Sequence, residues 1–205
     1  GEGGPVTEAT PLRPDNIYGV TKLEGEKVVR TYADRLHIPI VRISETYGPG
    51  DRRLLKLFSA LDSGRFVRIG PGRNFHHPVY IDDLVEGLRL SAEQPGAAGQ
   101  TFVLAGPAAV TTDEMIDAIA EAVGARAPGL RVPLSPLMAA AVVMESVLRP
   151  LGIQPPLHRR RMNFFVKSFK FDGGEADAAI GFTPQVGISE GARRTAEWYR
   201  EQGLL

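Results

Sequence analysis

Short apolar runs that alternate with helix-forming segments restrict the fold of this chain more than any other feature. Residues 18–36 contain no proline, and side chains along them recur at three-to-four spacing, which predicts a long helix. Residues 37–43, 78–81 and 101–104 are apolar runs of strand length, and helical spacing follows each of them. Strands that alternate with helices predict an α/β fold.

Charge and cysteine content exclude several classes of function. The chain has 24 basic and 24 acidic residues, so no positive excess favours a nucleic-acid partner. It has no cysteine, which excludes disulfides, thiolate catalysis and iron–sulfur clusters. The first residues, GEGGPVTE, lack the basic and apolar parts of a secretory signal. We therefore expect a cytoplasmic location.

The most apolar part of the chain is residues 132–144, thirteen residues without a charge. This stretch contains Pro133 and Pro136, and a membrane-spanning helix needs roughly 20 residues. The sequence therefore predicts no membrane span.

Tyr18 and Lys22 are the first candidates for chemistry, because a spacing of four places both side chains on one face of the predicted helix. A free tyrosine ionises at about pH 10, and a neighbouring ammonium favours the phenolate form that takes part in proton transfer. The spacing alone is more often that of an ordinary pair on a helix surface. The surrounding residues decide between the two interpretations.

Four segments, in order along the chain, resemble motifs of one enzyme family. They read PDNIYGVTKLEGE (14–26), VRISETYGPGD (41–51), FHHPVYIDDL (75–84) and EGARRTAEWY (190–199). The first is similar to the catalytic helix of the extended short-chain dehydrogenase/reductase family, the NAD-dependent epimerases and dehydratases. The others resemble the strand and turn after that helix, a later Val-Asp-Asp segment and the terminal helix of the same family.

The resemblance implies the C-terminal part of a Rossmann-type parallel sheet domain, together with a smaller α/β substrate-binding domain. It assigns residues 1–50 and 75–95 to the remaining part of the dinucleotide-binding domain. Residues 51–74 and 96–205 then form the substrate-binding domain.

The resemblance also implies NAD or NADP as cofactor, with hydride transfer to or from the nicotinamide ring. Tyr18 is the implied acid/base, and Lys22 the implied partner that holds the nicotinamide ribose. The implied cofactor-binding residues are Tyr18, Lys22, Ile43, Ser44 and Thr46.

Two parts of the family pattern have no counterpart before Tyr18. One is the Gly-x-x-Gly-x-x-Gly loop that binds the pyrophosphate, and the other is the catalytic serine or threonine, for which Thr7 and Thr10 are poor substitutes. The resemblance therefore covers the C-terminal two-thirds of such an enzyme, and we expect this chain to be inactive alone. The residue that selects NAD or NADP belongs to the same missing region.

Arg53, His76 and His77 are the positions where the resemblance implies substrate contacts. Sugar-nucleotide members commonly have an arginine in place of His76, and a mostly neutral histidine is a poor substitute for that permanent cation. This disfavours a nucleotide-sugar substrate. Neighbouring residues of a strand point to opposite faces, so we expect no metal site at the histidine pair.

The apolar residues 134–151 and the sequence HRRR (158–161) resemble the 3β-hydroxysteroid dehydrogenase-like branch, whose substrates are apolar. Core packing, the wall of an apolar pocket and contact with an anionic membrane surface are open interpretations of this segment, in that order of preference.

The function expected is an NAD(P)-dependent oxidoreductase that acts on a secondary alcohol or ketone carbon of a small-molecule substrate. One alternative is a sugar-nucleotide epimerase or dehydratase. The other is a non-catalytic binding protein that kept the fold. The resemblance also implies a homodimer.

Overall fold

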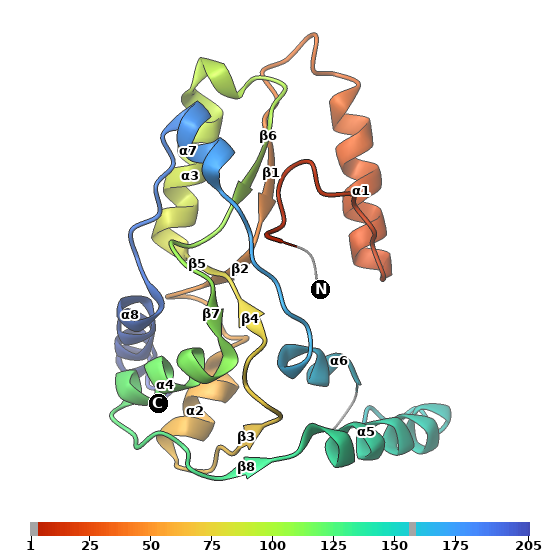
Figure 1. The fold of residues 1–205 in the computed structure, drawn as a ribbon, viewed down its shortest axis with the longest axis vertical. Coiled ribbons are helices and arrows are strands. Elements are labelled where there is room, and N and C mark those ends of the chain that lie inside the picture. The colour runs from red at the N-terminus through yellow and green to blue at the C-terminus, as the bar shows by residue number, and fades with distance from the viewer. Residues whose placement is uncertain (1–3, 156–158) are drawn as a thin grey trace. The chain divides into compact units, whose positions relative to one another are not determined.

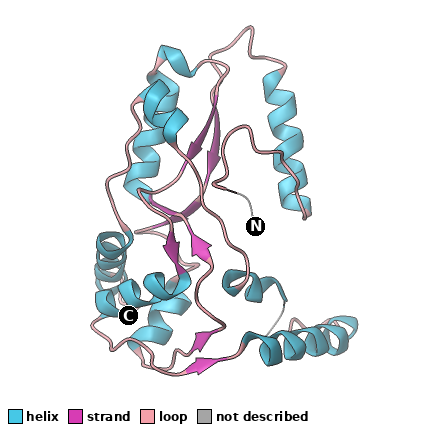
Figure 2. Ribbon diagram, viewed as in Figure 1, coloured by secondary structure: helices cyan, strands magenta, loops and turns pink. Residues whose placement is uncertain are grey.

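The computed structural model describes residues 4–155 and 159–205, and Figures 1 and 2 show its helices and strands. Its internal contacts define two compact units, each built from three separate segments of the chain. The first comprises Gly1–Gly48, His77–Ala109 and Lys170–Gly187, and the second Pro49–His76, Val110–Phe169 and Ile188–Leu205. Both units combine helices with strands, so the α/β prediction is confirmed.

Two pairs of parallel strands form the sheet structure of the first unit. Strand β1 (Ile40–Ile43) pairs with β6 (Thr101–Leu104), and β2 (Glu45–Tyr47) pairs with β5 (Pro78–Tyr80). Parallel strands need a long connection rather than a tight turn. Helix α3 (Ile81–Glu93) provides one between β5 and β6.

Helix α3, the short helix η1 (Pro95–Ala97) and α7 (Gly174–Ile180) pack around the buried core of this unit. Leu104 of β6 and Phe182 belong to this core. Gly87 of α3 approaches both closely, because a Cβ atom built on it would lie 2.7 Å from Leu104 Cδ1 and 2.9 Å from the Phe182 ring. The packing of α3 therefore depends on a residue without a side chain.

Helix α1 (Ile17–Arg30) lies on the other side of the β1–β6 pair (Figure 1). Asn16 caps it, since its Oδ1 atom accepts a hydrogen bond from the N–H of Gly19 at 2.9 Å. The sequence predicted a helix over residues 18–36. In the structure the helix ends at Arg30, and turns follow it. Every residue of α1 is at least partly exposed. Its exposed large apolar side chains are Ile17, Tyr18, Val20, Val28 and Val29.

Helices α2 (Leu55–Asp62), α4 (Thr112–Val123) and α8 (Ile188–Glu201) form the core of the second unit. Tyr199 of α8 is buried there, and its hydroxyl donates a hydrogen bond to the backbone carbonyl of Asp51. Burial raises the pKa of Tyr199 to about 12, so this hydroxyl remains a donor over the whole physiological range.

Two short strand pairs complete the second unit. Strand β3 (Arg68–Ile69) pairs in parallel with β8 (Arg131–Val132). Strand β4 (Phe75–His76) pairs antiparallel with β7 (Val110–Thr111). Thr111 is the last residue of β7 and also the N-cap of α4. It caps the helix through a reciprocal capping box with Glu114.

The apolar segment of the second unit forms helix α5 (Leu134–Leu148), which continues into η2 (Arg149–Leu151). This stretch has 18 residues and a mean hydropathy of 1.3, and 11% of it is buried. By length and composition it is able to cross a membrane. The sequence argument against a span counted only the uncharged run, which stops before Glu145, whereas helix α5 continues past Glu145 to Leu148. The absence of a span stays a prediction.

Helix α6 (Arg159–Met162) and the short helix η3 (Asn163–Phe165) follow α5. They belong to the second unit, as α5 does. His158, the first residue of the basic cluster in the sequence, lies outside the described residues.

The two units differ from the predicted domains at residues 49–50 and 75–76, and over the longer segments 96–109 and 170–187. Both longer segments were assigned by sequence to the substrate-binding domain, and both belong to the first unit. The reason is strand pairing between distant residues, since β6 pairs with β1 and Phe171 forms a parallel bridge with Val6.

Candidate active site

Tyr18 and Lys22 lie next to each other on helix α1. The ammonium nitrogen of Lys22 is 5.6 Å from the centre of the Tyr18 ring, within the range of a cation–π contact. The Tyr18 side chain is 67% exposed, so a ligand has access to it. The geometry brings together the two side chains predicted to carry the chemistry.

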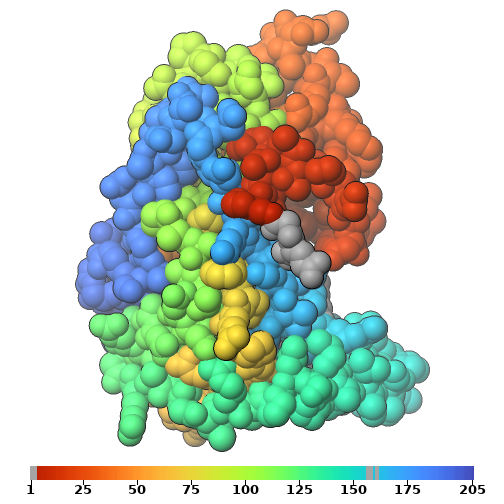
Figure 3. Space-filling view, viewed as in Figure 1, coloured from red at the N-terminus to blue at the C-terminus, as the bar shows by residue number. Residues whose placement is uncertain are grey.

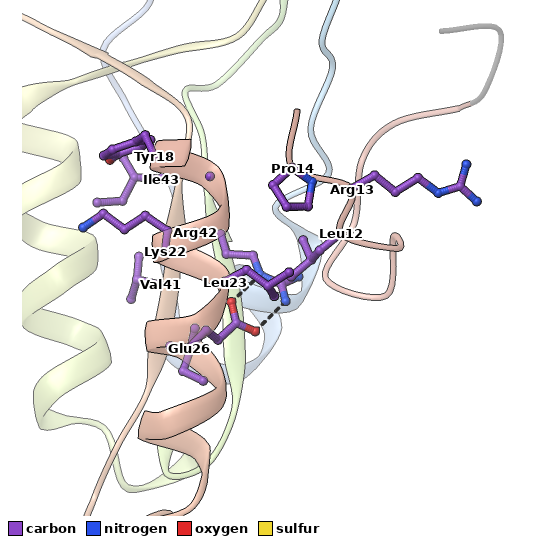
Figure 4. A pocket seen from close by; sticks show the side chains of 12 residues that line it. Leu12, Arg13, Pro14, Tyr18, Lys22, Leu23, Glu26, Val41, Arg42 and Ile43 are labelled. Atoms are coloured by element: carbon purple, nitrogen blue, oxygen red, sulfur yellow. Dashed lines mark hydrogen bonds and ion pairs between the residues drawn. The ribbon is translucent and has the colours of Figure 1, made fainter. Parts of the chain in front are cut away.

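An open cavity of about 560 Å³ lies beside this pair, between helix α1 and strand β1 (Figure 4). Ile43, the last residue of β1, lines it, and its side chain lies beside Tyr18 in Figure 4. Leu12 and Arg13 of the N-terminal loop contribute to the lining. The volume falls within the range of pockets for small organic molecules.

Ser44 directly follows β1, one residue beyond the cavity lining. Its hydroxyl oxygen is buried and has no hydrogen-bond partner within the described part of the chain. Its backbone N–H donates to the carbonyl of Leu104 at 3.0 Å, which fixes the residue at the end of the β1–β6 pair. Buried hydroxyls nearly always have a partner, so this orphan calls for an explanation, and the cofactor contact of Ser44 stays a prediction.

Glu26 and Arg42 hold helix α1 against β1. Arg42 donates to the two carboxylate oxygens of Glu26 at 2.8 and 3.2 Å, and also to the backbone carbonyl of Glu8 at 2.8 Å. The hydrogen bond from Arg42 is the main reason that the pKa of Glu26 lies below its ordinary value of 4.5. A second hydrogen bond, from Arg30, acts in the same direction.

Sequence reasoning missed this pair. A signal was present, because Tyr18, Lys22 and Glu26 follow one another at steps of four on the helix.

Thr46 and Arg53 are not among the residues that line the cavity. Thr46 is in strand β2, opposite Val79 of β5. Arg53 belongs to the second unit, and its side chain is exposed and donates to the carboxylate of Asp51 at 2.9 Å. Their cofactor and substrate roles stay predictions.

His76 is buried in the second unit. Its Nε2 atom is 3.0 Å from the hydroxyl of Thr112, and its ring lies 4.4 Å from the Phe164 ring, centre to centre. These contacts tie β4 to α4 and η3. The structure shows His76 in contact with residues of its own unit. A substrate contact through His76 stays a prediction.

His77 is buried in the first unit, and both of its ring nitrogens are engaged by the backbone. Nδ1 accepts a hydrogen bond from the N–H of Phe171 at 3.0 Å, so Nε2 carries the proton and donates to the carbonyl of Gly106 at 2.9 Å. Burial lowers the pKa of His77, which keeps the ring neutral in this role. The geometry gives His77 a structural role, and it leaves no ring nitrogen for a substrate.

Metal ligands do not gather in the described residues, which contain no group of three or more histidine, aspartate or glutamate side chains placed to hold an ion. The two histidines illustrate this, because they bind different partners in different units.

Residues 1–105, just over half of the chain, match the sequence profile of the NAD dependent epimerase/dehydratase family, and the chain belongs to that family. The resemblance seen in the sequence is thereby confirmed.

Two curated relatives and one solved structure illustrate the relationship. The chain is 28% identical to 3beta-hydroxysteroid-dehydrogenase/decarboxylase isoform 2 of Arabidopsis thaliana, with 95% of the chain and 37% of the relative covered. It is 27% identical to UDP-glucose 4-epimerase of Mycolicibacterium smegmatis, with 97% and 57% covered. The dTDP-glucose 4,6-dehydratase DesIV of Streptomyces venezuelae, solved with NAD bound, superposes with a TM-score of 0.69 at 25% identity, with 100% and 58% covered.

These superpositions confirm the prediction of part of a Rossmann-type α/β fold. The chain spans little more than half the length, or less, of the relatives it matches.

Proposed function

We propose that this chain carries the catalytic helix and part of the substrate domain of an NAD(P)-dependent oxidoreductase, which transfers hydride at a secondary alcohol or ketone carbon. The observation that carries the proposal is the Tyr18–Lys22 pair beside the cavity between α1 and β1. Membership of the epimerase/dehydratase family supports the cofactor class.

Bound NAD or NADP supplies the hydride acceptor or donor at its nicotinamide ring. The protein supplies proton transfer and positioning. The exposed hydroxyl of Tyr18 gives a proton to the substrate oxygen in reduction and takes it in oxidation. Lys22 places a positive charge beside the tyrosine ring and donates hydrogen bonds to the ribose hydroxyls. The orphan hydroxyl of Ser44, at the end of β1, would bind a polar group of the nicotinamide half once cofactor binding makes it accessible.

The Glu26–Arg42 pair positions the helix that carries Tyr18 and Lys22. It fixes α1 against β1, two turns along the helix from Tyr18. The distance between the tyrosine hydroxyl and a ligand at the end of β1 therefore depends on it. Positional errors of about 1 Å in such sites reduce rates by about 10²-fold.

This proposal and its first alternative, a sugar-nucleotide epimerase or dehydratase, differ in the class of substrate. The relatives named above favour the alternative by number, since two of the three have a sugar nucleotide in their names. The residue at position 76 favours the oxidoreductase, because a buried histidine bonded to Thr112 is not a free cation for a diphosphate. We therefore propose an uncharged alcohol or ketone as substrate.

Cofactor titration tests the proposal. In full-length protein that contains this chain, calorimetry is expected to show one saturable site for NAD or NADP, and secondary alcohols are expected to reduce the bound cofactor. No binding in the full-length protein would overturn the proposal and favour a non-catalytic binding protein. Turnover of UDP-glucose but of no simple alcohol would favour the epimerase alternative.

The same titration on the 205-residue chain tests the fragment proposal. Amides at the glycine-rich loop orient the diphosphate in this class of fold. The Tyr18 cavity contacts the nicotinamide half alone, so we expect no measurable binding at millimolar cofactor. A saturable isotherm in the micromolar range would show that residues of this chain suffice.

A further inference from the structure

Helix α5 has one packed face and one exposed face. Its buried residues are Ala141 and Glu145, four residues apart and hence on the same side. On the opposite side, Val143 is 61% and Val147 56% exposed, and Leu151 continues this face through η2. The segment lies at the surface in Figure 3, where it is turquoise. An apolar stripe of this length is the kind of exposed patch that marks an interaction site.

The polar side chains of α5 do not interrupt the stripe. The hydroxyl of Ser146 donates to the backbone carbonyl of Val142 at 2.9 Å, so its hydrogen bond is made within the helix. The carboxylate of Glu145 is 5% exposed and accepts hydrogen bonds from Arg159 Nε at 2.8 Å and Arg149 Nη2 at 3.3 Å. The one negative charge of the helix is therefore buried and compensated, while both guanidinium groups reach solvent.

The sequence around α5 is strongly basic. Residues 126–167 contain seven lysines or arginines and one acidic residue, Glu145, in a chain whose formal net charge is zero. A second copy of the chain would bring two such segments together, and like charges oppose that contact. An anionic surface attracts the segment.

The packed face of α5 determines whether the helix spans a membrane or lies on its surface. Glu145, near the C-terminal end of α5, is tied to α6 through the backbone N–H and the side chain of Arg159. A spanning helix faces lipid or other membrane-embedded helices on all sides, whereas one side of α5 is fixed to α6 of the same unit. With one side held by α6, only the free apolar side of α5 is left to contact a membrane, and the basic residues around it are attracted to anionic headgroups.

From these observations we propose that α5 docks the chain on a membrane surface rich in anionic lipid, with Val143, Val147 and Leu151 in the acyl boundary and Arg149 and Arg159 at the headgroups. The proposal is independent of the proposed function.

Vesicle sedimentation tests it on the 205-residue chain. We expect binding to phosphatidylcholine vesicles that contain phosphatidylglycerol, little binding to phosphatidylcholine alone, and loss of binding when salt rises from about 50 to about 500 mM. Val147→Glu is expected to lower the partition coefficient about tenfold or more. Val85→Glu is the matched control, because Val85 on α3 is 57% exposed and carries the same substitution outside the stripe.

Failure to bind the anionic vesicles, or equal binding by Val147→Glu, would overturn the proposal. So would a concentration-dependent dimer that Val147→Glu abolishes in the absence of vesicle binding, because a second copy would then occupy the stripe. If Val147→Glu lowers the melting temperature, single-cysteine labelling replaces it, since the chain has no cysteine. A polarity-sensitive dye at Val147→Cys is expected to shift to shorter wavelength on anionic vesicles, and the same dye at Val85→Cys is not. Equal responses at both positions would contradict the proposal.

Discussion

The guanidinium group of Arg42, in strand β1, donates hydrogen bonds to both carboxylate oxygens of Glu26, in helix α1, and this pair joins the helix to the sheet. Helix α1 has no buried residue of its own. Its position against β1 therefore depends on a polar contact more than on apolar packing.

Glu26→Gln is expected to lower the free energy of unfolding by roughly 1 to 2 kcal/mol at pH 7, because it removes the charge that Arg42 and Arg30 bind. The pKa of Glu26 is lowered in the fold, so the ionised carboxylate stabilises the folded state above pH 4.5. That contribution is lost as pH falls through the lowered pKa. Urea unfolding at several pH values should show the wild type and the variant converging in acid.

Tyr18→Phe in the full-length enzyme is expected to lower turnover by about 10² to 10⁴-fold, because it removes the hydroxyl that transfers the proton. Cofactor binding should remain. Tyr32→Phe is the control, since Tyr32 is also exposed but lies beyond the end of α1. Turnover at wild-type level in Tyr18→Phe, at saturating substrate, would remove Tyr18 from the mechanism.

Lys22→Ala in the full-length enzyme is expected to weaken cofactor binding and to lower turnover, because the proposed mechanism assigns one ammonium to both the ribose and the tyrosine. Lys27→Ala provides the comparison, since Lys27 makes an exposed ion pair with Glu24 on the same helix. Calorimetry with NAD and NADP measures the effect. Unchanged affinity in Lys22→Ala would show that Lys22 does not hold the ribose.

Ser44→Ala separates stability from function. The hydroxyl has no hydrogen-bond partner among the described residues, so its removal should leave the melting temperature unchanged or raise it. In the full-length enzyme the same change should weaken cofactor binding, since the ligand loses a hydrogen bond. A drop in melting temperature with normal cofactor affinity would mean that the hydroxyl is structural.

Gly87→Ala is expected to destabilise the first unit by about 1 to 3 kcal/mol, because the new methyl group collides with Leu104 and Phe182 in the core. Gly25→Ala is the matched control. A Cβ at Gly25 meets no atom within 4 Å, so the substitution should stabilise α1 by roughly 0.5 to 1 kcal/mol. Thermal melts of the two variants should therefore move in opposite directions.

Local sequence patterns predicted the parts of this fold that depend on neighbouring residues. The four-residue spacing of Tyr18 and Lys22 placed them on one face, and the apolar runs at residues 78–81 and 101–104 predicted strands β5 and β6. Contacts between distant residues were out of reach. The hydrogen bonds that His77 makes with the carbonyl of Gly106 and the N–H of Phe171 are of this kind. No periodicity within a segment records which remote backbone group it meets.

The length of α5 shows a different limit. A count of uncharged residues ended the apolar stretch before Glu145, because a carboxylate is costly in an apolar setting. In the structure Arg149 and Arg159 compensate that charge, and the helix continues. One of these two partners, Arg159, lies 14 residues further along the chain than Glu145.

The interleaved segments of the two units have a consequence for synthesis on the ribosome. The first unit needs residues 170–187, which emerge after nearly all of the second unit has been made. Strand β1 leaves the ribosome well before its partner β6. Val6 likewise emerges long before Phe171, with which it forms a parallel bridge. Neither unit is therefore complete until the last segments are translated, so the nascent chain exposes unpaired strand edges for most of its synthesis.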